Sequence, residues 1–146
     1  MRRSGTIRIE VSPGELIDRL TILRIKDARM TDPRKLANVR AELLGLDSVY
    51  RRSISPSPEL EGLIDRLRRV NELLWEAEDE VRGCEAAHDF GGHFASHARS
   101  IYRLNDERAA LKRQINVLLG SRLMEEKAHG VAVGGHFRRS GSSVII

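Results

Sequence analysis

Residues Pro58–His88 read PELEGLIDRLRRVNELLWEAEDEVRGCEAAH, and this stretch decides the fold. Its apolar residues recur in alternating steps of three and four, which is the a/d repeat of a helix packed lengthwise on another helix. These residues are Leu60, Leu63, Leu67, Val70, Leu74, Ala77, Val81 and Cys84. Ser57 suits an N-cap and Pro58 the first helical position, so the stretch predicts one helix about 45 Å long.

A second long helix is expected at residues 93–124, after the short sequence HDFGG at residues 88–92. Its apolar stripe is interrupted near the middle, where Asn105, Arg108 and Lys112 fall on it. Two long helices joined by a short turn that contains glycine predict an antiparallel hairpin.

Upstream of this hairpin, two shorter helices are expected at residues 13–30 and 33–50, with Ser12 as the N-cap before Pro13 and Asp32 or Thr31 as the N-cap before Pro33. The first carries apolar residues well beyond a single stripe, so it is expected to be buried on more than one side. Residues 6–11, TIRIEV, alternate between apolar and polar side chains, which is typical of a β-strand. A lone strand needs a partner, and residues 131–133, residues 144–146 or the same strand of a second subunit are the candidates.

The chain therefore predicts an all-α fold, a helical bundle of two short helices packed on a long antiparallel helical hairpin, with a short N-terminal β-strand. Residues 1–127 are expected to form a single domain, and residues 128–146 a C-terminal tail. The serine- and proline-containing segment between the second and third helices is short, so it is interpreted as a loop inside that domain.

Composition limits the classes of function. Only 4% of the residues are aromatic and 32% are charged, which suits helices with narrow apolar seams. Narrow seams gain buried area by self-association, so a homodimer is expected. The formal net charge of +4 comes from the ends of the chain, because residues 12–137 are balanced. A balanced body lacks the basic stripe of a specific nucleic-acid partner.

The localisation is predicted from features that the sequence lacks. The chain has a single cysteine, no apolar run long enough to span a membrane and no signal-peptide pattern at its start. A cytoplasmic protein without a membrane partner is therefore expected.

Polar residues form a second stripe beside the seam of the first long helix. If the arms are antiparallel, Glu78 meets Asn105 or Arg108, and Asn71 meets Arg108 or Lys112. Glu85 then meets Arg99. One interpretation is a network of ion pairs and amides that sets the register of the hairpin. The other is a polar pocket, roofed by Trp75, for a small anionic or sugar-like ligand.

Four segments resemble a small bacterial family of unknown function. They are VSPGELIDRLTILRIK from Val11, VNELLWEAEDEVR from Val70, ARSIYRLNDERAALKRQIN from Ala98 and GSRLMEEK from Gly120. The resemblance covers roughly residues 11–127 and implies a helical domain, with no established activity to carry over. Relatives are loosely associated with cell-surface glycan genes. Arg24 stands where the family usually has an acidic residue, which puts any acidic role there in doubt.

The resemblance also supplies the candidate polar site, either ligand-binding or structural. Its residues are Asp18, Lys26, Asn71, Trp75, Glu78, Asp79, Arg82, Glu85, Arg99, Asn105, Asp106, Arg108 and Lys112.

Other chemistries are weaker. A zinc set of one cysteine and three histidines is conceivable around the hairpin turn, but the cysteine falls on the apolar seam. Its members are Cys84, His88, His93 and His97. Carboxylates of a nucleotide pyrophosphohydrolase would share the helical face of Glu72 and Glu76, but its EExxE motif is absent. No glycine-rich phosphate loop occurs, and no cofactor is expected.

The function expected from the sequence is that of a cytoplasmic helical interaction or scaffolding module, self-associating as a dimer. The alternative is a small-ligand-binding protein or an enzyme, either of a carbohydrate pathway or a nucleotide hydrolase. It would use the polar network between the two long helices.

Overall fold

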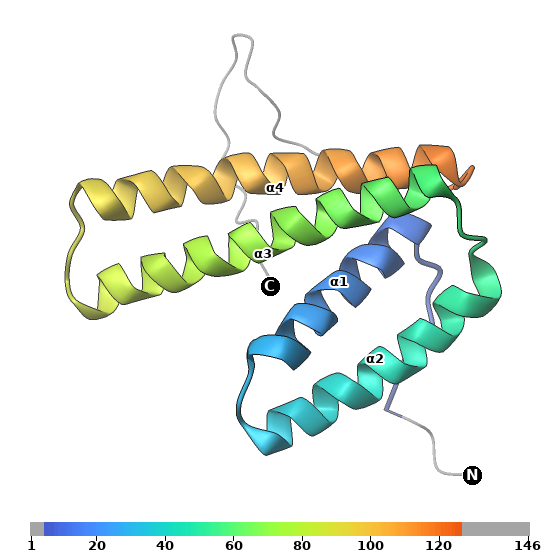
Figure 1. Cartoon of the computed structure of the whole chain (residues 1–146), viewed down its shortest axis with the longest axis horizontal. Coiled ribbons are helices and arrows are strands. Elements are labelled where there is room, and N and C mark those ends of the chain that lie inside the picture. The colour runs from blue at the N-terminus through green and yellow to red at the C-terminus, as the bar shows by residue number, and fades with distance from the viewer. Residues whose placement is uncertain (1–4, 127–146) are drawn as a thin grey trace, which may run out of the picture.

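The computed structural model describes residues 5–126, which form four helices (Figure 1). They are α1 (Pro13–Arg29), α2 (Pro33–Ser53), α3 (Pro58–Ala86) and α4 (Gly92–Leu118). α3 and α4 lie side by side as an antiparallel hairpin, α1 packs on both of them, and α2 packs on α1 (Figure 1). The predicted all-α class is confirmed for the described residues.

Three of the four helices begin as the sequence predicts, with a polar N-cap followed by proline. Ser12 Oγ accepts a hydrogen bond from Glu15 N at 3.1 Å, and Ser57 Oγ accepts one from Leu60 N at 3.1 Å. Asp32 caps α2 in the same way. These caps satisfy amide groups that have no partner inside the helix, so each helix start is stabilised by its own local sequence.

The core lies where α1 crosses the hairpin. Its central cluster is Ile17, Leu60, Leu67, Val70, Leu74, Leu111 and Ile115. α1 is buried on several sides, as predicted, because it lies between α2 and the hairpin. α2, by contrast, has only Val39 fully buried. The core is therefore formed by α1, α3 and α4.

Surface ion pairs supplement the thin apolar contact between α1 and α2. Arg24 Nη2 lies 3.1 Å from Asp47 Oδ1, and Arg19 Nη2 lies 2.6 Å from Glu42 Oε1. The resemblance implies an acidic residue at the position of Arg24. In this chain Arg24 makes a contact between α1 and α2, although exposed ion pairs contribute little free energy each.

The far half of the hairpin projects beyond α1 (Figure 1). No residue between Glu78 and Ala110 is fully buried. The predicted seam continues into this half, but its members Val81 and Cys84 are only half-buried. No third helix covers the two helices in this half, so the residues at the edges of their contact stay partly exposed to solvent.

Two features differ from the sequence-based expectation. The predicted β-strand at residues 6–11 does not form, and Ile7 and Ile9 are 88% and 76% exposed. No described segment offers that strand an edge, and the candidate partners at 131–133 and 144–146 lie outside the described residues. The last helix ends at Leu118 instead of near residue 124, because Gly120 takes a φ of +67° that terminates the helix.

Candidate functional site

Asp18 of α1 is the centre of a buried polar network. Its side chain is 3% exposed and both carboxylate oxygens accept hydrogen bonds from Arg108 of α4. Arg108 Nε lies 2.9 Å from Oδ1 and Nη2 lies 2.7 Å from Oδ2. This two-bond geometry is the strongest form of the carboxylate–guanidinium pair, so it ties α1 to α4.

Asn71 connects the same carboxylate to α3. Its Nδ2 donates to Asp18 Oδ1 at 3.0 Å and to Thr21 Oγ1 at 2.7 Å, and the Thr21 hydroxyl donates to the Asp18 carbonyl oxygen at 2.7 Å. Asn71 Oδ1 is buried and has no hydrogen-bond partner within residues 5–126. The amide of Asn71 therefore fixes the position of α1 along α3.

Lys112 forms the next part of the network, one turn along α4 from Arg108. Its Nζ lies 2.8 Å from Glu15 Oε2, 3.2 Å from Glu125 Oε2 and 4.0 Å from Asp18 Oδ2. Burial acts to lower the pKa of Lys112, but the hydrogen bond to Glu15 and the surrounding carboxylates outweigh it and raise that pKa. Lys112 is therefore held in its charged form.

The guanidinium of Arg108 is perturbed in the same way. Burial opposes its charge, while the hydrogen bonds and charge of Asp18 favour it, and the net effect raises the pKa of Arg108 further. Arg108 is thus held in its charged form, and the Asp18 carboxylate compensates that charge inside the fold.

A close contact between helices supports this arrangement at the start of α1. Gly14 N donates to Asn116 Oδ1 at 2.7 Å. A Cβ atom at Gly14 would lie 2.5 Å from the Lys112 carbonyl oxygen and 2.8 Å from Asn116 Oδ1. Only glycine permits this approach of α1 to α4, which brings the carboxylates of α1 within reach of Lys112.

Of the thirteen predicted site residues, the structure brings four together: Asp18, Asn71, Arg108 and Lys112. They do not meet as expected, because Asn71 and Arg108 both bind Asp18 of α1 instead of contacting each other across the hairpin. The predicted pairing of Glu85 with Arg99 makes no ion pair within the described chain, and both side chains are exposed. The network therefore joins three helices, not two.

The remaining predicted residues lie outside this network. Lys26, Trp75, Glu78 and Asn105 are half-buried, and Asp79, Arg82 and Asp106 are exposed.

Glu78 differs from its neighbours because it is half-buried and forms no ion pair within residues 5–126. Burial raises the pKa of Glu78, and the nearby charges of Arg82 and Arg108 only partly offset this. Burial thus disfavours the charged form of Glu78.

Sequence reasoning missed Gly14, Glu15, Asn116 and Glu125 as members of the network. All four lie in the segments that carry the resemblance, so membership of those segments did not distinguish them. Asn116 follows the apolar Ile115 in a stripe where an amide is unexpected.

The conceivable zinc set is not assembled. Within residues 5–126, no three His, Cys, Asp or Glu side chains lie close enough to hold a metal ion. His97 Nε2 instead lies 3.9 Å from Glu80 Oε2, and His88 occupies the turn with a φ of +53°. Cys84, His88, His93 and His97 therefore do not converge on one point.

The fold and the network define an all-helical protein in which one short helix is anchored on a long hairpin by buried charges. Across residues 5–126, none of the helices is long and apolar enough to cross a membrane. The chain belongs to a family of unknown function, DUF6165, which matches residues 7–139. That match extends beyond the segments that carried the resemblance. No curated protein and no solved structure matches the chain.

Proposed function

We propose that this chain is a helical interaction module that self-associates through its α3–α4 hairpin. The observation that carries the proposal is the incomplete cover of the hairpin. α1 is the only described helix that packs on it, and it leaves the projecting half uncovered (Figure 1). In that half Phe94, Ile101 and Leu104 are only half-buried.

The energetic reason to expect self-association is the small apolar area that the seam of the hairpin buries. A two-helix hairpin buries one narrow stripe of apolar surface, which barely offsets the conformational entropy lost on ordering the chain. A second hairpin packed against the first adds a layer and roughly doubles the buried area per helix. Helical bundles commonly reach stability in this way.

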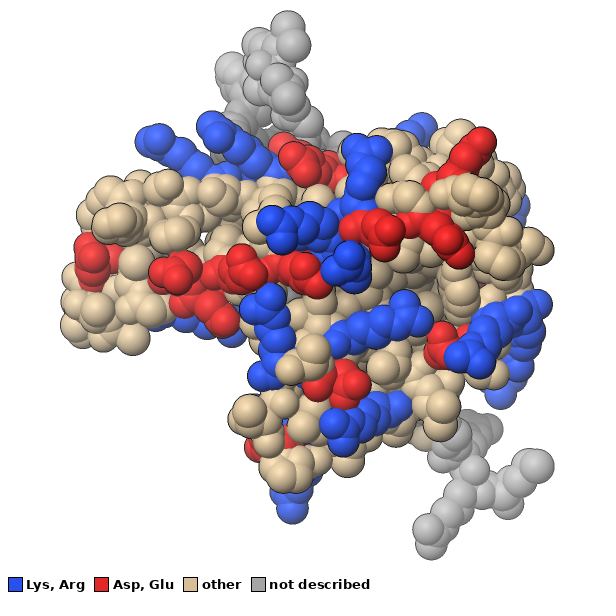
Figure 2. Space-filling view, viewed as in Figure 1, with Lys and Arg blue, Asp and Glu red and all other residues tan. Residues whose placement is uncertain are grey.

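Charge distribution supports a protein partner. Beyond Ala77, α3 carries Glu78, Asp79, Glu80 and Glu85 against a single Arg82. Figure 2 shows acidic side chains in a row along the projecting half of the hairpin. A row of one sign on an uncovered element favours contact with a surface of the opposite charge, so a second copy should approach with basic side chains, and not with its own acidic row, opposite this one.

The test is the native mass of the untagged protein, measured gently and then under denaturing conditions, with light scattering over a concentration series. A dimer without additional mass is the expected result. A monomer at every concentration would refute self-association.

A second candidate function rests on Glu78. A half-buried carboxylate without an ion pair in the described chain, flanked by Arg82 and by half-buried Trp75, suits binding of a small polar or sugar-like ligand. In the same native-mass experiment, a stoichiometric adduct lost on denaturation would favour this function. Glu78→Gln should then abolish the adduct without changing the fold.

A further inference from the structure

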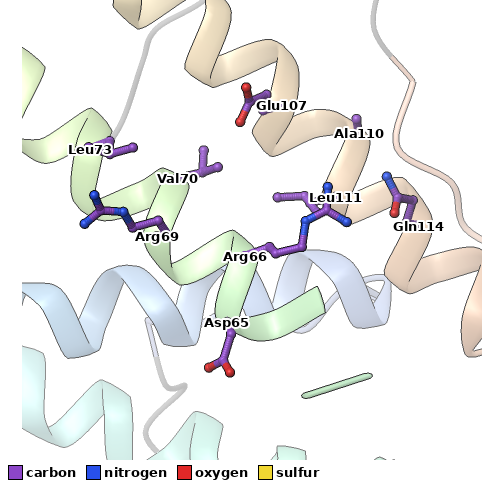
Figure 3. A pocket seen from close by; sticks show the side chains of 9 residues that line it. All are labelled: Asp65, Arg66, Arg69, Val70, Leu73, Glu107, Ala110, Leu111 and Gln114. Carbon is purple, nitrogen blue, oxygen red and sulfur yellow. The ribbon is translucent and has the colours of Figure 1, made fainter. Parts of the chain in front are cut away.

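A shallow groove of about 540 Å³ lies between α3 and α4. Its floor is apolar and consists of Val70, Leu73, Ala110 and Leu111. Its edges are polar, with Asp65, Arg66 and Arg69 contributed by α3 and Glu107 and Gln114 by α4 (Figure 3). An apolar floor with a polar rim is the usual composition of a protein-binding surface.

The groove lies on the side of the hairpin turned away from α1. Asn71 faces α1, because it binds Asp18. Arg69 and Leu73 are each two positions from Asn71, which places them about 200° round the helix. No α1 or α2 residue lines the groove, and neither helix covers it.

Three charged residues at the rim of this groove have no ion-pair partner inside the described chain. Arg66, Arg69 and Glu107 form no ion pair within residues 5–126, although fourteen other close pairs of opposite charge occur there. The two cations lie on the α3 edge, where Asp65 also lies but pairs with Arg68 at 4.0 Å, and the carboxylate without an ion pair in the described chain, Glu107, lies on the α4 edge. The α3 edge thus carries a net positive charge and the α4 edge a negative one.

This arrangement is self-complementary. A two-fold axis that runs along the hairpin places α3 of one copy over α4 of the other. Arg69 of each copy then faces Glu107 of the second copy, and the apolar floors meet between the two charge pairs. Rim charges of this kind select the partner and its orientation more than they add affinity.

We infer that the groove is the docking surface for a second copy of this chain, with Arg69 of each copy paired to Glu107 of the other. The inference rests on the proposed self-association and specifies its interface. The side of the hairpin is large enough for this. A helix of 29 residues is about 43 Å long, and two helices about 10 Å apart present a face of about 800 Å². A standard stable interface buries about that much per partner.

Charge reversal tests the pairing. Arg69→Glu places two carboxylates opposite each other in the homodimer, and Glu107→Lys places two cations opposite each other. Each variant alone should weaken dimerisation at least tenfold, measured by light scattering. An equimolar mixture of the two should form a heterodimer, because both contacts then join opposite charges. The double variant Arg69→Glu/Glu107→Lys should again form a homodimer.

Arg34→Glu is the matched control, since Arg34 is an exposed arginine of α2 without an ion pair in the described chain. It should leave the dimer unchanged, and circular dichroism should show that every variant is folded. If the wild type dimerises but the reversals have no effect, or the mixture fails to restore the dimer, the groove is not the interface. A wild type that is monomeric throughout would refute the proposed self-association as well.

Discussion

Replacing Asp18 with asparagine tests whether the buried network holds α1 on the hairpin. The substitution preserves the shape of the side chain and the acceptor used by Asn71, but removes the charge. Arg108, whose side chain is only 15% exposed, would be left without its two-bond partner, and Lys112 would lose one of three carboxylates. The variant thus creates an uncompensated buried cation.

The magnitude follows from the loss of one partner of a buried pair, which costs about 3–5 kcal/mol. With a urea slope of about 2 kcal/mol per molar, the midpoint of unfolding should fall by about 2 M. Unfolding should be followed by circular dichroism at one fixed protein concentration, because self-association adds a concentration-dependent contribution.

Glu42→Gln is the matched control, because it breaks an exposed α1–α2 ion pair of similar length, 2.6 Å. Exposed pairs contribute about 1 kcal/mol or less, so its midpoint should hardly change. The double variant Asp18→Asn/Arg108→Met should recover part of the lost stability, because no lone charge remains buried. Equal small losses in Asp18→Asn and Glu42→Gln would refute the assignment of Asp18 as the anchor of α1.

Four further variants test other parts of the structure. Gly14→Ala should lower the free energy of unfolding by about 1–3 kcal/mol, because its Cβ would meet the Lys112 carbonyl oxygen. Gly45→Ala, in open space on α2, should raise it by about 0.5–1 kcal/mol in the same urea assay. The raised pKa of Glu78 means that its contribution to stability is present below the ordinary value of 4.5 and lost as pH rises through the folded pKa. Glu78→Gln should therefore be more stable than the wild type at pH 7 but not at about pH 4, measured by thermal unfolding. The raised pKa of Lys112 gives a contribution present below 10.5 and lost as pH rises through the folded pKa. As pH rises from 10.5 through the folded pKa of Lys112, the wild type should lose stability more steeply than Lys112→Met. Parallel stability curves for the two proteins at alkaline pH would contradict this.

Local signals predicted most of the secondary structure. Serine or aspartate followed by proline marked the starts of α1, α2 and α3 correctly, because a cap is formed by neighbours in the chain. The alternation at residues 6–11 was misleading, because a strand requires a partner edge that local sequence does not supply.

The end of α4 shows a stop signal that outweighs a periodic apolar pattern. Apolar residues continue after Leu118, and they predicted a helix to residue 124. Gly120 terminates it earlier, with Ser121 N donating to the Asn116 carbonyl oxygen at 2.8 Å. A glycine at this position is a recognisable helix terminator, so the signal was present in the sequence.

The candidate site was only partly predictable. The resemblance placed Asp18, Asn71, Arg108 and Lys112 in one set, but helical spacing paired the α3 and α4 residues with each other. Helical periodicity describes which face of a helix a residue occupies, not which third helix lies on that face. The crossing of α1 over the hairpin decided that Asp18 receives both partners.

The sequence by itself determined the helical class, the starts of three helices and the apolar seam of the hairpin, because these depend on neighbours within a few turns. Only the tertiary structure decided that α1 covers one half of one side of the hairpin, bringing Asp18 to Arg108 and Gly14 to Asn116. It also decided that neither α1 nor α2 covers the groove beside Arg69 and Glu107. These features depend on the angle and register at which distant helices cross, which follow from the packing of the whole core.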